Sequence, residues 1–217
     1  MENSGIPLNL IGQLKFFLKG ISYNNLRCLY IASRDSFGAK YFHLRCDGKE
    51  GLVVIIKANG YYFGGYTSSS FKSLNDQKKG WIESEKSFIF SLSNPQNNPA
   101  IFKCPKTLYG IYDDPSFGPC FVGFSFLNSQ KQTKIYIYDN SNKTDKNFAN
   151  IGKQNFIYQL FFGGLLIFQK KGEENKMSYE ESKTFLCGLS NFKVEEMEVY
   201  HINYKMKYLP NQEKIKN

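Results

Sequence analysis

The sequence of 217 residues contains few of the residue types that usually carry out chemistry in proteins. It has two histidines, His43 and His201, and five cysteines without a C-x-x-C pair. The odd number and wide spacing of the cysteines argue against a zinc ribbon and against a disulfide framework. A catalytic dyad would need a histidine beside a thiol, as His43 and Cys46 could provide on a helix. Core packing is the commoner reason for such a pair, so we predict no catalytic residue, cofactor or metal site.

Long apolar runs and targeting signals are also absent. The most apolar stretch, FIYQLFFGGLLIF at 156–168, is shorter than the ~20 residues of a membrane-spanning helix. Its glycine pair favours strands or a buried turn, so no transmembrane segment is predicted. The beginning, MENSGIPLNL, lacks the basic and apolar regions of a secretory signal. We therefore expect a reducing, cytoplasmic environment.

A concentrated charge is missing as well, although the formal net charge is +9. The basic excess is five in residues 1–100 and four in residues 101–217. Nucleic-acid binders usually gather their charge in a patch or an arm, so nucleic-acid binding is not predicted. A general preference for acidic protein or membrane surfaces stays open.

The clearest structural pattern is LVVIIKANGYYFGGY at 52–66. Asn59-Gly60 favours positive φ at both turn positions, which predicts a type I′ β-hairpin. The unbroken apolar run before the turn predicts a strand covered on both faces, near the middle of a sheet. Gly64 and Gly65 lack a Cβ, so they permit a bend, a bulge or the close approach of another backbone.

Shorter patterns predict the remaining elements. Apolar residues at helical spacing predict an amphipathic helix between Pro7 and Gly20, and a short helix is expected at 38–46. Alternation predicts a half-buried strand at 87–93 and a final strand at 195–204. Further strands are expected at 26–32, 100–103, 109–112, 119–126 and 134–138, with polar loops at 33–36 and 139–147 and a turn at Asp113-Asp114-Pro115.

Several phrases, read in order, resemble those of a TLDc domain, the module named for TBC, LysM and oxidation-resistance proteins. They are LYIASRDSFGAKYFH at 29–43, CDGK at 46–49, LVVIIKANGYYFGGYTSSSF at 52–71, SFIFSL at 87–92, FGP at 117–119 and FLCGLSNFKVEEMEVYHI at 185–202. Their order and spacing over about residues 26–202 make the resemblance specific. The chain departs from the family pattern at Asp35-Ser36, where Asp-Gly is common, at 121–126 and over 139–176.

The resemblance implies an α+β, mainly β fold: two packed antiparallel β-sheets, a β-sandwich, flanked by a few helices. The TLDc domain would occupy residues 26–204, between a helical lead-in at 1–25 and a basic tail at 205–217. The resemblance also implies a non-enzymatic protein-interaction module. Proteins of this family are associated with resistance to oxidative stress and with binding the vacuolar-type proton ATPase.

Two other functions remain as alternatives. A structural subunit of a ciliary or cytoskeletal microtubule complex would suit the basic balance, because surfaces such as tubulin's are acidic, and would place the chain in the cytoskeleton or cilium. A thiol-based antioxidant enzyme would need cysteines in an electropositive, accessible setting. Most of the five cysteines lie among apolar residues, so core packing is the expected role.

Candidate interaction residues come from three stretches. Arg34 and Asp35 lie in the polar loop at 33–36. Glu196 and Glu198, near Glu195, lie on the last strand, where an exposed strand face or a contact with a basic partner is expected. Phe161 and Phe162 belong to the apolar stretch at 156–168, which would be an interaction surface if exposed. Asp113-Asp114 is expected to be a turn, because no Asp-x-Asp-x-Asp-Gly calcium loop surrounds it.

Overall fold

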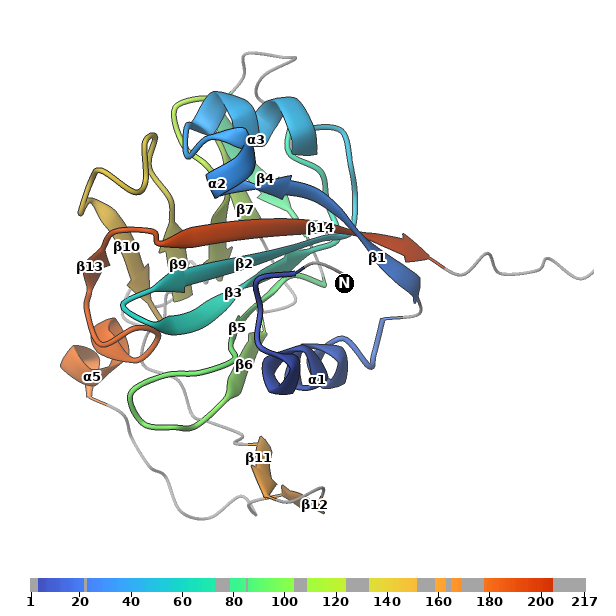
Figure 1. The fold of residues 1–217 in the computed structure, drawn as a ribbon, viewed down its shortest axis with the longest axis vertical. Coiled ribbons are helices and arrows are strands. Elements are labelled where there is room, and N and C mark those ends of the chain that lie inside the picture. Colours follow the sequence, from blue (N-terminus) through green and yellow to red (C-terminus); the bar gives the residue numbers. More distant parts are fainter. Residues whose placement is uncertain are drawn as a thin grey trace, which may run out of the picture.

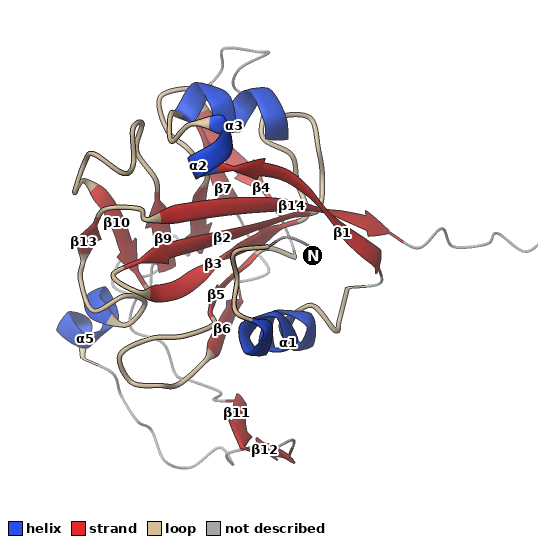
Figure 2. Ribbon diagram, viewed as in Figure 1, coloured by secondary structure: helices blue, strands red, loops and turns tan. Residues whose placement is uncertain are grey.

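The computed structural model describes residues 4–21, 23–72, 79–84, 86–103, 109–123, 133–151, 159–162, 165–168 and 178–204 (Figure 1). Strands predominate, and the helices lie at the periphery (Figure 2). The helices are α1 (Leu8–Phe17), α2 (Ala32–Asp35), α3 (Ala39–Cys46) and α5 (Tyr179–Thr184). The strands are β1 (Tyr23–Ile31), β2 (Leu52–Ala58), β3 (Tyr61–Thr67), β4 (Gly80–Glu83), β5 (Phe88–Ser91), β6 (Ala100–Lys103), β7 (Tyr109–Asp113), β8 (Cys120–Gly123), β9 (Thr133–Tyr136), β10 (Asn147–Asn150), β11 (Gln159–Phe162), β12 (Leu165–Phe168), β13 (Asn191–Phe192) and β14 (Glu196–Tyr204).

Two six-stranded antiparallel sheets pack against each other. The first has the order β1-β14-β2-β3-β5-β6 and the second β13-β10-β9-β8-β7-β4, while β11 and β12 form a separate pair. One apolar core lies between the sheets and contains residues of both, such as Val54 and Phe63 from the first and Ile111, Phe121 and Ile135 from the second. The predicted fold class, a mainly β sandwich with a few helices, is confirmed.

The predicted hairpin is formed by β2 and β3, at the centre of the first sheet. Asn59 and Gly60 have φ values of 50° and 78°, as a type I′ turn requires. Every residue of β2 except Lys57 is buried, so both of its faces are covered. The prediction of a central strand from the unbroken apolar run is confirmed.

Helix α1 packs on the outer face of the first sheet and is drawn beside β5 and β6 in Figure 1. Leu14, Phe17 and Leu18 are buried there in a second apolar cluster with strand residues that include Val53 and Phe90. The predicted helix between Pro7 and Gly20 is therefore confirmed. It gives the first sheet a core on each side.

Strand β14, the last strand, lies between the first strand, β1, and the central strand β2. It pairs with β1 on one side and with β2 on the other. Met197 and Val199 enter the core between the sheets, and Tyr200 and Ile202 enter the cluster under α1. The alternation predicted for this strand is confirmed, and both of its faces are buried.

Two predictions of local structure are wrong. Residues 33–36 were expected to be a loop, but α2 begins at Ala32 and ends at Asp35, whose carboxylate accepts a hydrogen bond from the Ile31 amide at 3.0 Å. The strand at 87–93 was expected to be half-buried, but all of β5 is buried, because α1 covers one face and the second sheet the other. The tail at 205–217 lies outside the described residues.

Candidate docking surface

Arg34 and Asp35 form the centre of a charged cluster at one end of the sandwich. The Arg34 guanidinium donates two hydrogen bonds to the Asp35 carboxylate, from Nε at 3.1 Å and from Nη2 at 2.6 Å. Arg45, one helix further on, reaches the same carboxylate from Nη2 at 3.4 Å. The Asp35 side chain is only 7% exposed, whereas those of Arg34 and Arg45 are 53% and 55% exposed. The carboxylate therefore anchors two guanidinium groups that face solvent.

The charged groups of this cluster stabilise each other in their ionised forms. The hydrogen bonds from Arg34 lower the pKa of Asp35, with further lowering by the Ile31 amide and by the charge of Arg45. The same hydrogen bonds raise the pKa of Arg34. Asp35 is thus fixed as an anion, and a partner would meet the arginines rather than the carboxylate.

Glu196 is brought to the same corner. Its Oε1 accepts hydrogen bonds from the backbone N–H of Ser33 at 3.1 Å and from its own neighbour Met197 at 2.9 Å. Ser33 lies in α2 directly before Arg34 and Asp35. Three of the predicted interaction residues, Arg34, Asp35 and Glu196, therefore lie together. The side chain of Glu196 ties α2 to β14.

A hollow of about 300 Å³ lies beside Glu196, lined by the three glutamates of residues 195–198, by Lys57 and Tyr62, and by the N-terminal residues Gly5 and Ile6. Its charged groups have partners in the chain. Glu195 pairs with Lys57 at 3.3 Å and accepts the Gly60 amide at 2.9 Å. The hydrogen bond to Glu195 raises the pKa of Lys57, which also lies 5.9 Å from the centre of the Tyr62 ring.

Glu198 differs from the prediction of an exposed strand face, because it is only 3% exposed. Its Oε1 accepts the Gly5 amide at 3.0 Å, and its Oε2 accepts the Ser4 hydroxyl at 3.1 Å and the Tyr200 hydroxyl. Burial, and then the hydrogen bond to Glu198, raise the pKa of Tyr200 and keep it a donor. Glu198 thus fastens the N-terminal segment to β14.

We expect Glu198→Gln to lower the free energy of unfolding by about 1–2 kcal/mol, since one of the two buried oxygens becomes an amide nitrogen facing hydroxyl donors. Hydrogen exchange at the Gly5 amide should accelerate, because its acceptor is weakened. The matched control is Glu195→Gln at the exposed position directly before the same strand, where a change within about 0.5 kcal/mol is expected. Equal losses in urea unfolding for the two variants would contradict the fastening role of Glu198.

The remaining predicted candidates, Phe161 and Phe162, lie on β11, which pairs with β12. Strands were one of the two alternatives expected for 156–168, and strands are present. The side chains of these two residues lie outside the described part of the structure.

His43 has a structural environment. The residue as a whole is 1% exposed, with Nδ1 at 2.7 Å from Asp47 Oδ1 and Nε2 at 2.8 Å from the Phe117 carbonyl and 3.1 Å from that of Asp114. Both nitrogens face acceptors, which suits the doubly protonated ring. Burial opposes that charge, but the hydrogen bond and charge of Asp47, with the Phe117 carbonyl and Asp113, raise the pKa of His43 above its ordinary value.

The described cysteines have raised thiol pKa values. Cys46, Cys120 and Cys187 are buried, and burial raises the pKa of each thiol, for Cys187 to about 11. Burial also raises the pKa of the half-exposed Cys28, although the nearby Arg34 opposes this shift. The thiols therefore stay protonated at neutral pH, and Cys104 lies outside the described residues.

Metal and membrane features can be assessed over the described ranges. Among these residues no group of three or more potential ligands is arranged to hold a metal ion. Within the same ranges no helix combines the length and the apolar character needed to cross a bilayer.

At the predicted turn, Asp113 accepts a hydrogen bond from the Lys72 amide at 2.7 Å, and Asp114 accepts one from the Ser116 amide at 2.8 Å. Asp114 also forms an ion pair with Lys79. Asp114 thus stabilises its own turn, whereas Asp113 holds the segment after β3.

Sequence reasoning missed the residues that surround Arg34 on the neighbouring helix. The outer side of α3 carries Lys40, Tyr41, Leu44 and Arg45, all exposed. The helical spacing of 41, 44 and 45 could have identified them as one face, because the buried residues Phe42 and Cys46 fix the inner side. The pattern was used only to recognise the helix.

The family model described as TLDc domain matches residues 6–203, from the start of the N-terminal segment to the last strand. It confirms the resemblance seen in the sequence. A search of curated proteins finds no match.

Proposed function

The chain belongs to the TLDc domain family, and on that basis we propose that it is a non-enzymatic protein-interaction module that contributes to oxidative-stress resistance by binding the vacuolar-type proton ATPase. It would act in the cytoplasm, on the cytoplasmic part of that assembly. The observation that carries the interaction role is the pair of guanidinium groups, Arg34 and Arg45, held at the surface by the buried carboxylate of Asp35. Arginine is favoured at protein interfaces because its planar fork binds carboxylates bidentately.

A non-enzymatic role is supported by the groups that could have served catalysis. His43 uses both ring nitrogens for hydrogen bonds inside the fold. Burial raises the thiol pKa of Cys46, which reduces its nucleophilic, ionised form. A purified chain that reduced peroxide at the expense of an added thiol would contradict this part of the proposal.

Affinity purification of the tagged full chain at low salt tests the partner. We expect subunits of the proton ATPase to be recovered, and to be lost as the salt concentration rises, because exposed ion pairs are screened. A tagged chain carrying Arg34→Ala and Arg45→Ala should recover less of the ATPase. Recovery of no ATPase subunit by the unchanged chain would contradict the proposal.

A second function, as a structural subunit of a microtubule complex, is favoured by the same exposed cations together with the net charge of +9. An acidic filament surface would attract such a chain. The same purification separates the two functions, because it would then recover filament proteins in place of ATPase subunits. Co-sedimentation with assembled microtubules gives the independent measurement.

A further inference from the structure

The outer side of α3 is a surface that the fold does not use. Its inner side consists of Ala39, Phe42, His43 and Cys46, which are buried against the sandwich. On its outer side Leu44 is 64% exposed and Tyr41 is 46% exposed. These two side chains lie three residues apart, so they are neighbours on the helix surface. Together they form an apolar pair that faces solvent.

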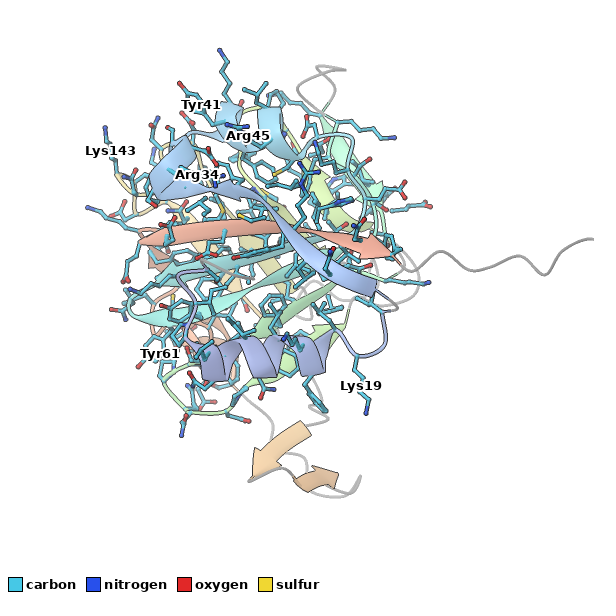
Figure 3. The ribbon with its side chains drawn as sticks, turned by 45° about the vertical axis from the view of Figure 1, so that its right-hand side comes forward. Lys19, Arg34, Tyr41, Arg45, Tyr61 and Lys143 are labelled. Carbon is cyan, nitrogen blue, oxygen red and sulfur yellow. The ribbon has the colours of Figure 1, made fainter. Side chains whose placement is uncertain are left out.

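Cations surround this apolar pair. Lys40 and Arg45 lie on the same helix and are exposed, and Arg34 lies on α2 beside it. Figure 3 shows Arg34, Tyr41 and Arg45 at the same end of the molecule, away from Lys19 at the end of α1. We refer to Arg34, Lys40, Tyr41, Leu44 and Arg45 as the α3 outer face.

The carboxylates near the α3 outer face accept hydrogen bonds from backbone amides. Asp35 accepts the Ile31 amide as well as its two arginines. Asp139 accepts the Ala39 amide at 2.7 Å at the start of α3, and Glu196 accepts the Ser33 amide. The negative charges therefore hold the helices in place, while the positive charges extend from them.

The guanidinium groups keep donors for a partner. Asp35 engages Nε and Nη2 of Arg34 and Nη2 of Arg45. The Arg34 guanidinium also reaches the Leu29 carbonyl from Nη2 at 3.5 Å and hydrogen-bonds with the Cys28 side chain. In the described part of the chain, the hydrogen bond of Arg45 is made by Nη2 alone, so its Nε and Nη1 remain as donors. A guanidinium has five N–H groups, so each arginine can still bind a carboxylate.

We propose that the α3 outer face is a docking surface for an acidic protein segment that carries an apolar side chain. The apolar side chain would cover Tyr41 and Leu44, and carboxylates before and after it would reach Arg34, Lys40 and Arg45. Charge complementarity selects an acidic partner, and the apolar pair selects a protein over a simple polyanion. This inference rests on the proposed interaction role, and it names the surface and the chemistry of the partner.

Binding of a synthetic probe tests the surface directly. The probe is a fluorescent peptide with the repeat Glu-Leu-Glu-Glu, and its affinity for the full chain is measured by anisotropy. We expect Lys40→Glu with Leu44→Glu to weaken binding by about tenfold or more, since both kinds of contact are lost. The matched control is Leu8→Glu at the start of α1 with Lys19→Glu two residues after its end, which makes the same two types of substitution at exposed positions.

Both double variants change the charge equally, so general electrostatics predicts equal losses. A selective loss in the α3 variant, with its melting temperature unchanged, supports the surface. Equal loss in both variants, no loss in either, or no binding to the unchanged chain overturns it. Equally tight binding of poly-glutamate or of a single-stranded RNA also overturns it, because the apolar pair would then have no role.

The two proposals fail separately. If ATPase subunits are recovered equally by the unchanged chain and by the α3 variant, the proposed function stands and the docking surface is wrong. If no ATPase subunit is recovered but peptide binding depends on Lys40 and Leu44, the docking surface stands and the proposed partner is wrong.

Discussion

Replacement of Gly64 by alanine should lower the free energy of unfolding by about 3 kcal/mol or more, because the new methyl group would collide with backbone. Gly64 lies in β3 opposite Ile55 and next to Phe90 of β5, at the centre of the first sheet. A Cβ at this position would approach the carbonyl oxygen of Val54 far inside contact distance, with the carbonyl carbon at 2.9 Å. The backbone of a buried central strand can shift only if the strands hydrogen-bonded to it shift as well.

Chemical denaturation compares this change with two matched ones. Gly65→Ala would place its Cβ 2.5 Å from the Phe121 ring of the second sheet, so a smaller loss is expected, since a side chain can adjust. Gly12→Ala on α1 has open space around it and should stabilise the chain by up to about 1 kcal/mol through helix propensity. A loss for Gly64→Ala no larger than that for Gly65→Ala would contradict the backbone contact.

The hairpin that contains Gly64 was predictable because its information is local. Asn59-Gly60 specifies the turn, and the apolar run at 52–56 specifies a strand buried on both faces. The glycine pair could be identified as a place of close approach, but the sequence could not show what approaches. Val54 is the strand neighbour of Gly65, whereas Phe121 comes from the other sheet.

Predictions failed where a distant segment covers a residue. Glu198 is a charged residue of the kind expected on an exposed strand face, but Ser4 and Gly5, almost two hundred positions earlier, donate hydrogen bonds to its carboxylate. The prediction of one solvent-exposed face for the strand at 87–93 failed for the same reason, since α1 covers that face. Burial of this kind depends on tertiary packing, which alternation along one strand does not report.

The candidate surface was predicted in part. Arg34 and Asp35 were selected as polar residues of a loop, and the structure places them in a helical turn with Glu196 beside them. The contribution of α3 was missed because the segment at 38–46 was identified as a short helix without assigning its two sides. Only the packing of Phe42 and Cys46 shows that the other side of this helix faces outward.

His43→Leu should lower the free energy of unfolding by about 3 kcal/mol at pH 6, because it removes one member of a buried, hydrogen-bonded pair. The side chains of His43 and Asp47 are 0% and 3% exposed, and Nδ1 and Oδ1 are 2.7 Å apart. The leucine would replace the volume of the ring but none of its hydrogen bonds to Asp47 or Phe117. Asp47→Asn should also be destabilising, since it removes the negative charge that favours the protonated ring.

The pH dependence of stability separates a charged His43 from a neutral one. Its folded-state pKa is raised above the ordinary value of 6.5, so its contribution is present in full below that pH and decreases as the pH rises through the folded-state pKa. The contribution of His201 to stability has the opposite pH dependence. Burial, Lys49 and Arg27 lower its pKa, so this contribution is lost as the pH falls below 6.5. Urea unfolding between pH 5 and 9 should therefore show the difference between the unchanged chain and His43→Leu shrinking as pH rises. A difference that stays constant across this range would mean that His43 has the same pKa in the folded and the unfolded chain, which would contradict the raised pKa. A difference that grows as the pH rises would mean that the ring is neutral in the folded state.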